Sequence, residues 1–128
     1  MSRILVVDDE EGIRTVIRRA LTLEGYEVIL AENGDEGEHR FRQNQPDLVI
    51  FDIVMPGKNG LEMLASLKAD FPDMKAIVIS GGGGQTAGAE DLAFLLGVAE
   101  GMGVYRTITK PFELEDILSA VRAALENG

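Results

Sequence analysis

The segment LVIFDIVMPG, residues 48–57, contains an apolar run that ends in a carboxylate, Asp52. An earlier segment, RILVVDD at residues 3–9, has the same form and ends in the pair Asp8-Asp9. Short, continuous, β-branched runs are typical of strands buried on both faces of a parallel sheet. If the two strands are neighbours, their acids meet at one edge of the sheet. Carboxylates that close repel one another unless a cation or a proton lies among them, and a hard divalent ion with oxygen ligands meets that need.

The totals of the sequence exclude several classes of protein. A chain of 128 residues fits one domain with one hydrophobic core. The absence of cysteine excludes disulfides, thiolate catalysis and cysteine-ligated zinc. The formal net charge of −10 disfavours direct binding to nucleic acid. The first apolar stretch is too short for a signal peptide, and no run approaches the length of a membrane span, so we expect a cytoplasmic location and no membrane contact.

The rest of the chain repeats one pattern, a short apolar strand followed by a helix. Strands are predicted at 3–7, 27–31, 48–51, 76–79 and 104–108, and helices at 11–25, 35–42, 60–70, 92–99 and 114–128. On the helix at 60–70, one side is predicted to carry Leu61, Leu64, Ala65 and Lys68. Strands separated by helices run parallel with right-handed crossovers, so the pattern predicts a doubly wound α/β domain.

Polar side chains collect at the carboxyl ends of the predicted strands, where ligands bind in folds of this class. These ends carry Asp8, Asp9, Asp52, Ser80 and, just past the last strand, Lys110. Carboxylates can hold Mg²⁺, and a carboxylate can also accept a phosphoryl group covalently. Phosphoryl transfer needs neutralisation of the charge on the transferring oxygens, which Mg²⁺, the Lys110 ammonium and the Ser80 hydroxyl can supply. The single histidine, His39, is predicted on a helix surface away from this edge.

These residues resemble the receiver domain of bacterial two-component response regulators, in its single-domain, chemotaxis-regulator-like form. The resemblance covers essentially the whole chain, taken as one domain at 1–128. It rests on five motifs in the family's order: Asp8-Asp9, Asp52, Met55-Pro56-Gly57 with Asn59-Gly60, Ser80, and Lys110-Pro111-Phe112. It implies a flavodoxin-like, doubly wound three-layer sandwich with a five-stranded parallel sheet and five helices.

The resemblance also implies a function. Asp52 is expected to accept a phosphoryl group from a sensor histidine kinase or a phosphotransfer protein, with Mg²⁺ or Mn²⁺ as cofactor. Asp9 and Asp52 are expected to bind the metal directly and Asp8 through water, and the backbone carbonyl of Val54 completes the protein ligands. Such a protein is not a conventional enzyme, although it assists its own phosphorylation and dephosphorylation.

In the same family, Ser80 and Lys110 are expected to contact the phosphoryl oxygens. Phosphorylation is expected to draw the Ser80 hydroxyl inward and to shift the surface made by the predicted elements at 92–99, 104–108 and 114–128. That surface is expected to control a downstream protein target. Whether phosphorylation also causes dimerisation stays open.

The chain departs from the family between Ser80 and Lys110, where 29 residues intervene. The excess lies in the glycine-rich segment 81–88 and around 97–103, and we expect the segment after Ser80 to be mobile. The family's switch aromatic falls on Thr107, and the nearest aromatic is Tyr105, which a strand places on the same face. Either Tyr105 substitutes for the switch aromatic or the coupling is missing.

Other interpretations remain open. Each motif alone has a structural explanation: an acidic helix start, a strand-ending cap at Asp52, a turn at Ser80 or a helix start at Lys110-Pro111. The arginines of the first helix, Arg14, Arg18 and Arg19, form either a solvated face or a kinase-docking face. As a whole, the chain can also be a degenerate receiver that acts as an unphosphorylated interaction module. An aspartyl-phosphate phosphatase is disfavoured, because Val54 stands where haloacid-dehalogenase-like enzymes carry an aspartate.

Overall fold

The structure is a computed structural model that describes residues 2–53, 55, 59–80 and 89–126. The expected carbonyl ligand of Val54 and the glycine-rich segment 81–88, which we predicted to be mobile, lie outside the described residues. The predicted alternation of strands and helices is confirmed. The elements are β1 (Arg3–Val7), α1 (Glu11–Leu23), β2 (Glu27–Ala31), α2 (Gly34–Asn44), β3 (Leu48–Asp52), α3 (Gly60–Asp70), β4 (Ala76–Ser80), α4 (Ala89–Gly101), β5 (Arg106–Thr109) and α5 (Leu114–Glu126).

The ends of some elements differ from the prediction. Strands β3 and β4 are each one residue longer than predicted, so Asp52 and Ser80 are the last residues of their strands. Strand β5 begins at Arg106, two residues later than predicted, and ends at Thr109. Helix α4 continues to Gly101, so part of the extra length before Lys110 is helical rather than loop.

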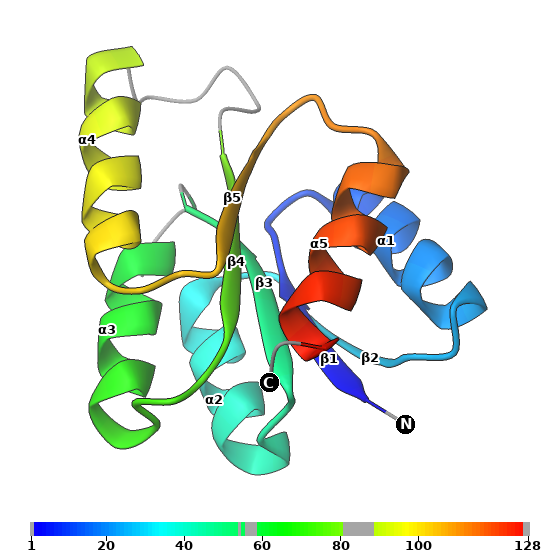
Figure 1. Ribbon diagram of the computed structural model, residues 1–128. Coiled ribbons are helices and arrows are strands. Elements are labelled where there is room, and N and C mark those ends of the chain that lie inside the picture. Colours follow the sequence, from blue (N-terminus) through cyan, green and yellow to red (C-terminus); the bar gives the residue numbers. More distant parts are fainter. Residues whose placement is uncertain (1, 54, 56–58, 81–88, 127–128) are drawn as a thin grey trace.

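The five strands form one parallel sheet in the order β2-β1-β3-β4-β5 (Figure 1). This is the strand order of flavodoxin-like folds, in which ligands bind where the order reverses. The reversal lies between β1 and β3, because β1 connects through α1 to β2 on one side and pairs with β3 on the other. Val7 pairs with Phe51, so the residues that follow them, Asp8 and Asp52, emerge side by side at the carboxyl edge.

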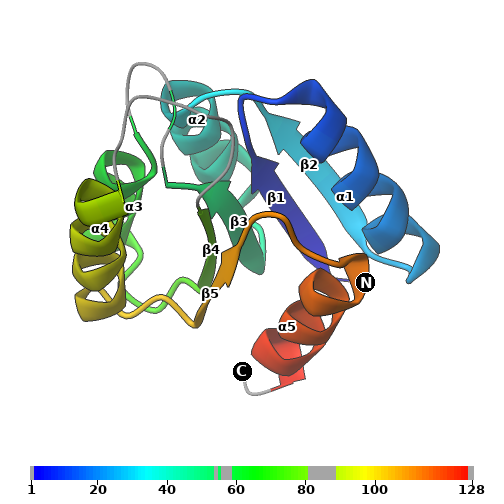
Figure 2. The same cartoon turned by 90° about the horizontal axis from the view of Figure 1, so that it is seen from above.

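Helices cover both faces of the sheet, as predicted for a three-layer sandwich. Figure 2 shows α1 and α5 on one face and α2, α3 and α4 on the other. Alternate residues of β1 serve the two faces: Ile4 and Val6 belong to the core under α1 and α5, and Leu5 and Val7 to the core under the other three helices. All four side chains are fully buried. Burial on both faces explains why the central strands are continuously apolar instead of alternating.

Helix α3 faces the core with a stripe that shares only Leu64 with the side described from the sequence. Its buried residues include Met63, Leu64 and Leu67, whereas Ala65 is exposed and Leu61 is only partly buried. Met63 and Leu67 remove much more apolar area from water than Ala65 does, so their stripe decides which side faces the core. The helix begins with a capping box, in which the Asn59 side chain accepts from the Glu62 backbone N–H.

The first residue of α3, Gly60, lies directly against the end of β3. A Cβ atom at this position would stand 2.6 Å from the backbone oxygen of Asp52 and would also overlap the Phe51 ring. Real Cβ atoms do not come so close to a carbonyl oxygen, and a backbone atom cannot move aside as a flexible side chain can. The glycine therefore lets the start of α3 pack on the peptide that carries Asp52.

The close packing at Gly60 gives a prediction about stability. Gly60→Ala is expected to lower the free energy of unfolding by about 1–3 kcal/mol, because the added methyl overpacks the contact with β3. The matched control is Gly97→Ala in α4, where a Cβ would meet nothing within 4 Å. That change is expected to raise stability by about 0.5–1 kcal/mol, as alanine does in a helix interior. Urea unfolding measures both, and a Gly60→Ala midpoint at or above that of the wild type contradicts the packing argument.

Candidate functional site

Four acids lie together at the carboxyl edge of β1 and β3. Asp8 follows β1 and is fully buried, and Asp52 ends β3 and is also buried. One carboxylate oxygen from each of Asp8, Asp9, Glu10 and Asp52 lies within 4.8 Å of the others. The structure therefore brings together the three acids that the sequence predicted. It adds Glu10, which the sequence analysis did not include in the site.

Lys110 places its ammonium among these acids. Its backbone N–H donates to the Ser80 carbonyl at 2.7 Å, which fixes the segment after β5 to the end of β4. Its Nζ lies 2.9 Å from Asp52 Oδ2, 3.0 Å from Glu10 Oε1 and 3.2 Å from Asp8 Oδ2. The side chain is only 7% exposed. The predicted proximity of Lys110 to Asp52 is thus observed, with two further carboxylates on the same ammonium.

The crowding of these charges shifts the pKa of two groups. Burial raises the pKa of Asp8 from 3.8 to about 6, against the opposing effects of the Glu10 backbone N–H and the Lys110 charge, and the nearby Asp52 raises it further. Burial acts in the opposite sense on Lys110. The hydrogen bond and charge of Asp52, with Asp8 and Glu10, outweigh it and raise the pKa of Lys110 above its ordinary value. Lys110 is therefore a fixed positive charge at neutral pH.

The donor set of this edge fits a hard divalent cation. It consists of carboxylate oxygens from acids on two neighbouring chain segments, with no sulfur or imidazole among them. Asp8 Oδ2 is buried and accepts no hydrogen bond within the described chain, although the ammonium lies nearby. A buried, charged oxygen without a donor is a position that a cation or a bound water satisfies. Glu10 lies at the solvent side of the cluster, and Mg²⁺ usually keeps several water ligands.

Ser80 ends β4, next to the strand that carries Asp52. The backbone N–H of Ile53 donates to the Ile79 carbonyl at 3.0 Å, so the ends of β3 and β4 are joined at this level. The Ser80 side chain is almost completely buried, and its hydroxyl has no hydrogen-bond partner among the residues that the structure describes. A buried hydroxyl without a partner loses about 1–3 kcal/mol of hydrogen bonding to water. Because Ser80 ends its strand beside the acids, a ligand bound at this edge could accept a hydrogen bond from its hydroxyl.

Arg14 has a role that the sequence analysis did not identify. Its guanidinium donates from Nη1 to the Asp8 carbonyl oxygen at 2.6 Å, and its side chain is only 14% exposed. It therefore holds the loop between β1 and α1, which carries the paired acids. Arg18 and Arg19 are exposed, so the predicted arginine face of α1 separates into one structural residue and two surface residues. The sequence pattern that could have indicated this role is an arginine one turn into the helix that follows an acidic loop.

The predicted switch residues lie on and beside β5. Thr107 is half-buried in the strand, opposite Val78. Tyr105 precedes the strand, with its backbone N–H bonded to the Ala76 carbonyl, and its side chain is 37% exposed. The Arg106 guanidinium lies 5.7 Å from the centre of the Tyr105 ring. Whether Tyr105 substitutes for the switch aromatic stays a prediction.

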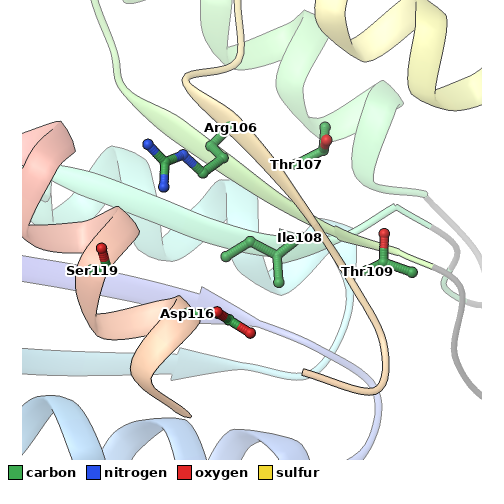
Figure 3. Close-up of a pocket in the computed structure, with 6 residues that line it drawn as sticks. All are labelled: Arg106, Thr107, Ile108, Thr109, Asp116 and Ser119. Atoms are coloured by element: carbon green, nitrogen blue, oxygen red, sulfur yellow. The ribbon is translucent and has the colours of Figure 1, made fainter. Parts of the chain in front are cut away.

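A shallow groove follows the same strand on its α5 side. Its lining residues are Arg106, Thr107, Ile108, Thr109, Asp116 and Ser119. Figure 3 shows Arg106 and Ile108 on the side of the strand toward α5, and Thr107 and Thr109 on the other side. The groove is therefore part of the surface between β5 and α5 and does not include the acids at the strand edge. His39 is exposed on α2, as predicted.

Comparisons with known proteins agree with this site. The profile of the response regulator receiver domain matches residues 4–122. The chain is 37% identical over 123 residues to the response regulator MprA of Mycobacterium sp. strain KMS, covering 96% of this chain and 50% of that protein. It is 35% identical over 125 residues to the DNA-binding transcriptional regulator NtrC of Azospirillum brasilense, covering 98% of this chain and 24% of that protein. The chain thus spans about half the length, or less, of these curated relatives.

Solved structures show the same fold. A response regulator receiver domain protein from Clostridium thermocellum superposes with a TM-score of 0.86 and 31% identity, covering 99% of this chain and 96% of that one. A CheY-like receiver domain protein from Methanospirillum hungatei JF-1 gives a TM-score of 0.84 and 31% identity, covering 99% and 95%. The flavodoxin-like fold is thereby confirmed. By its sequence and its fold, the chain belongs to the response regulator receiver domain family of two-component signalling systems.

Proposed function

We propose that residues 1–128 act as one receiver domain that takes up a phosphoryl group on Asp52 from a phosphohistidine of a sensor kinase or a phosphotransfer protein. Receiver domains are signalling proteins rather than conventional enzymes. The observation that carries the proposal is the buried contact of the Lys110 ammonium with Asp52 and Asp8, at 2.9 and 3.2 Å. A fixed cation beside a carboxylate at a strand end is what an incoming phosphoryl group requires.

The chemistry follows from the positions of these groups. An Asp52 oxygen forms the new P–O bond while the P–N bond to the donor imidazole breaks, and the ring leaves with the electron pair and takes up a proton. Lys110 stays beside the transferring oxygens, because its side chain is buried and its backbone is bonded to Ser80. The Ser80 hydroxyl, which has no partner within the described chain, can donate to one of these oxygens.

The acids at the edge support a role for Mg²⁺ or Mn²⁺. Asp9 and Asp52 would hold the metal directly and Asp8 through water, with the Val54 carbonyl as the remaining protein ligand. When bound, the metal supplies further neutralisation of the phosphoryl charge. Asp8 and Asp52 are already held at the ends of adjacent strands, so the protein needs little rearrangement to present these ligands.

The output of the domain is proposed to pass through the surface of α4, β5 and α5 to a protein partner. Lys110 connects the acids to this surface, because it follows β5 directly and its backbone is bonded to β4. The net charge of −10 supports a protein partner rather than nucleic acid for this domain. No helix in the described part of the chain is long and apolar enough to cross a membrane. We propose that the domain works in the cytoplasm.

Phosphorylation by a small donor tests the proposed acceptor. With acetyl phosphate and Mg²⁺, the wild type is expected to gain the mass of one phosphoryl group, and Asp52→Asn is expected to gain none, because the amide is not a nucleophile. Intact-mass spectrometry measures both. The matched control is Asp73→Asn, an exposed acid far from the strand edge, which keeps the gain. No gain in the wild type contradicts the receiver function, and steady turnover of a phosphomonoester would revive the phosphatase interpretation.

Removal of the metal tests the cofactor. EDTA is expected to abolish the mass gain, and excess Mg²⁺ or Mn²⁺ is expected to restore it. Asp9→Asn is expected to weaken Mg²⁺ binding at least about tenfold in isothermal titration calorimetry, because it removes a direct charged ligand. Asp73→Asn again serves as the control and keeps the wild-type affinity. Unchanged Mg²⁺ affinity in Asp9→Asn places the metal elsewhere.

The raised pKa of Asp8 predicts a pH-dependent gain in stability for Asp8→Asn in EDTA. The pKa is about 6 in the folded protein against 3.8 for the ordinary group, so the folded state binds the proton more tightly than the unfolded state. The ionised Asp8 therefore destabilises the fold above about pH 6, and this loss disappears as the pH falls through 6 toward 4.

Asp8→Asn removes that ionisation. It keeps a side-chain oxygen that can accept the hydrogen bond from the Glu10 backbone N–H, which is 2.9 Å long in the wild type. It is expected to raise the free energy of unfolding by about 1–3 kcal/mol at pH 8. The gain should become small near pH 4.5, where Asp8 is protonated in the folded wild type. Urea unfolding at three pH values measures the effect, and a loss of stability at pH 8 refutes it.

A further inference from the structure

Glu10 occupies an unusual place between the helix and the acidic edge. It is the residue before α1, the position at which a side chain normally accepts a hydrogen bond from the first turn, but its side chain makes no such bond. Its carboxylate instead receives a hydrogen bond from Lys110 Nζ at 3.0 Å. The two residues are 100 positions apart in the chain. A helix-capping role therefore does not explain the orientation of this side chain.

Carboxylates crowd the ammonium of Lys110, which donates hydrogen bonds to Glu10 Oε1 and Asp52 Oδ2. It carries three N–H groups, and three carboxylates lie within 3.2 Å of it, from Asp8, Glu10 and Asp52. The lysine side chain is only 7% exposed, so water has little access to it. An oxygen of a phosphoryl group that approaches this ammonium therefore competes with the carboxylates around it.

The three carboxylates differ in how easily they can leave. Asp8 is fully buried and also accepts the Glu10 backbone N–H at 2.9 Å. Asp52 is buried at the end of β3 and is the group that would carry the phosphoryl group. The Glu10 side chain is 48% exposed and reaches the ammonium from the solvent side. A carboxylate that leaves toward water regains its hydration, whereas one that loses its partner inside the protein does not.

We propose that Glu10 is the exchangeable partner of Lys110. Its carboxylate holds the ammonium in place before transfer, and a phosphoryl oxygen replaces it when Asp52 is phosphorylated. The inference rests on the proposed function, since it assumes that Asp52 is the acceptor. Glu10 is thus a positioning residue that slows phosphorylation and opposes the binding of phosphate-like anions, because it competes with them for the same N–H group.

The experiment compares Glu10→Gln with Glu11→Gln in two measurements. Glu11 is the next acid along the chain and is exposed, and its substitution changes the net charge equally. The first measurement is the rate of phosphorylation by acetyl phosphate at saturating Mg²⁺. The second is the affinity for beryllium trifluoride, an analogue of the phosphoryl group, by calorimetry with Mg²⁺. For Glu10→Gln both are expected to rise about two- to fivefold, the range of a half-exposed ion pair. For Glu11→Gln both should stay close to the wild type.

A second variant separates contact from charge. Glu10→Asp keeps the negative charge but shortens the side chain by one methylene, so it is expected to lose the Lys110 contact and to behave like Glu10→Gln. Wild-type behaviour of Glu10→Asp, or equal effects of Glu10→Gln and Glu11→Gln, overturns the proposal. A weaker Mg²⁺ affinity in Glu10→Gln, measured without the analogue, also overturns it, because Glu10 would then be a metal ligand.

The failure of this proposal can be distinguished from the failure of the proposed function. Phosphorylation of the wild type that depends on Asp52, together with unchanged rates in the Glu10 variants, removes the exchange but leaves the acceptor role intact. A wild type that gains no phosphoryl group and binds no beryllium trifluoride removes both. Urea unfolding of the variants completes the test, because an exchangeable surface contact should leave the unfolding midpoint nearly unchanged.

Discussion

The ammonium of Lys110 is the one charge on which the organisation of the site depends. It lies within 3.2 Å of carboxylates from the end of β1, the end of β3 and the loop before α1. Buried carboxylates at that spacing are tolerable only with a cation among them. Since β4 lies between β3 and the strand that precedes Lys110, a long side chain is required to reach Asp52. The small Ser80 at the end of β4 suits that requirement.

The same site is an unfavourable place for Asp8. Burial raises the pKa of this carboxyl to about 6, so at neutral pH the folded protein holds an ionised acid that would be better hydrated in the unfolded chain. Local conflicts of this kind are typical of functional sites, where stability is given up for binding. A cation bound at the carboxyl edge would relieve the repulsion between these neighbouring carboxylates. Neutralising Asp8 is therefore expected to raise stability and to weaken the binding of a metal.

Much of the fold was predictable because the central strands are continuously apolar and end at charged or turn-forming residues. Asp8, Asp52 and Lys110 were predictable as a group because parallel strands bring their carboxyl ends to one edge. The roles of Glu10 and Arg14 were not, since each depends on a contact that only the folded chain defines. The start of β5 was predicted wrongly, because an apolar pattern does not reveal where strand pairing begins.

The contact between Gly60 and the Asp52 peptide constrains the end of β3 on one side. The first turn of α3 leaves no room for even one methyl group behind the Asp52 peptide, so β3 is closely packed on that side. At the carboxyl edge, the Ser80 hydroxyl has no partner among the residues that the structure describes, and Lys110 contacts the half-exposed Glu10. Atoms added at Asp52 therefore meet close packing toward α3, so any movement that they cause is expected on the side of Ser80 and Lys110.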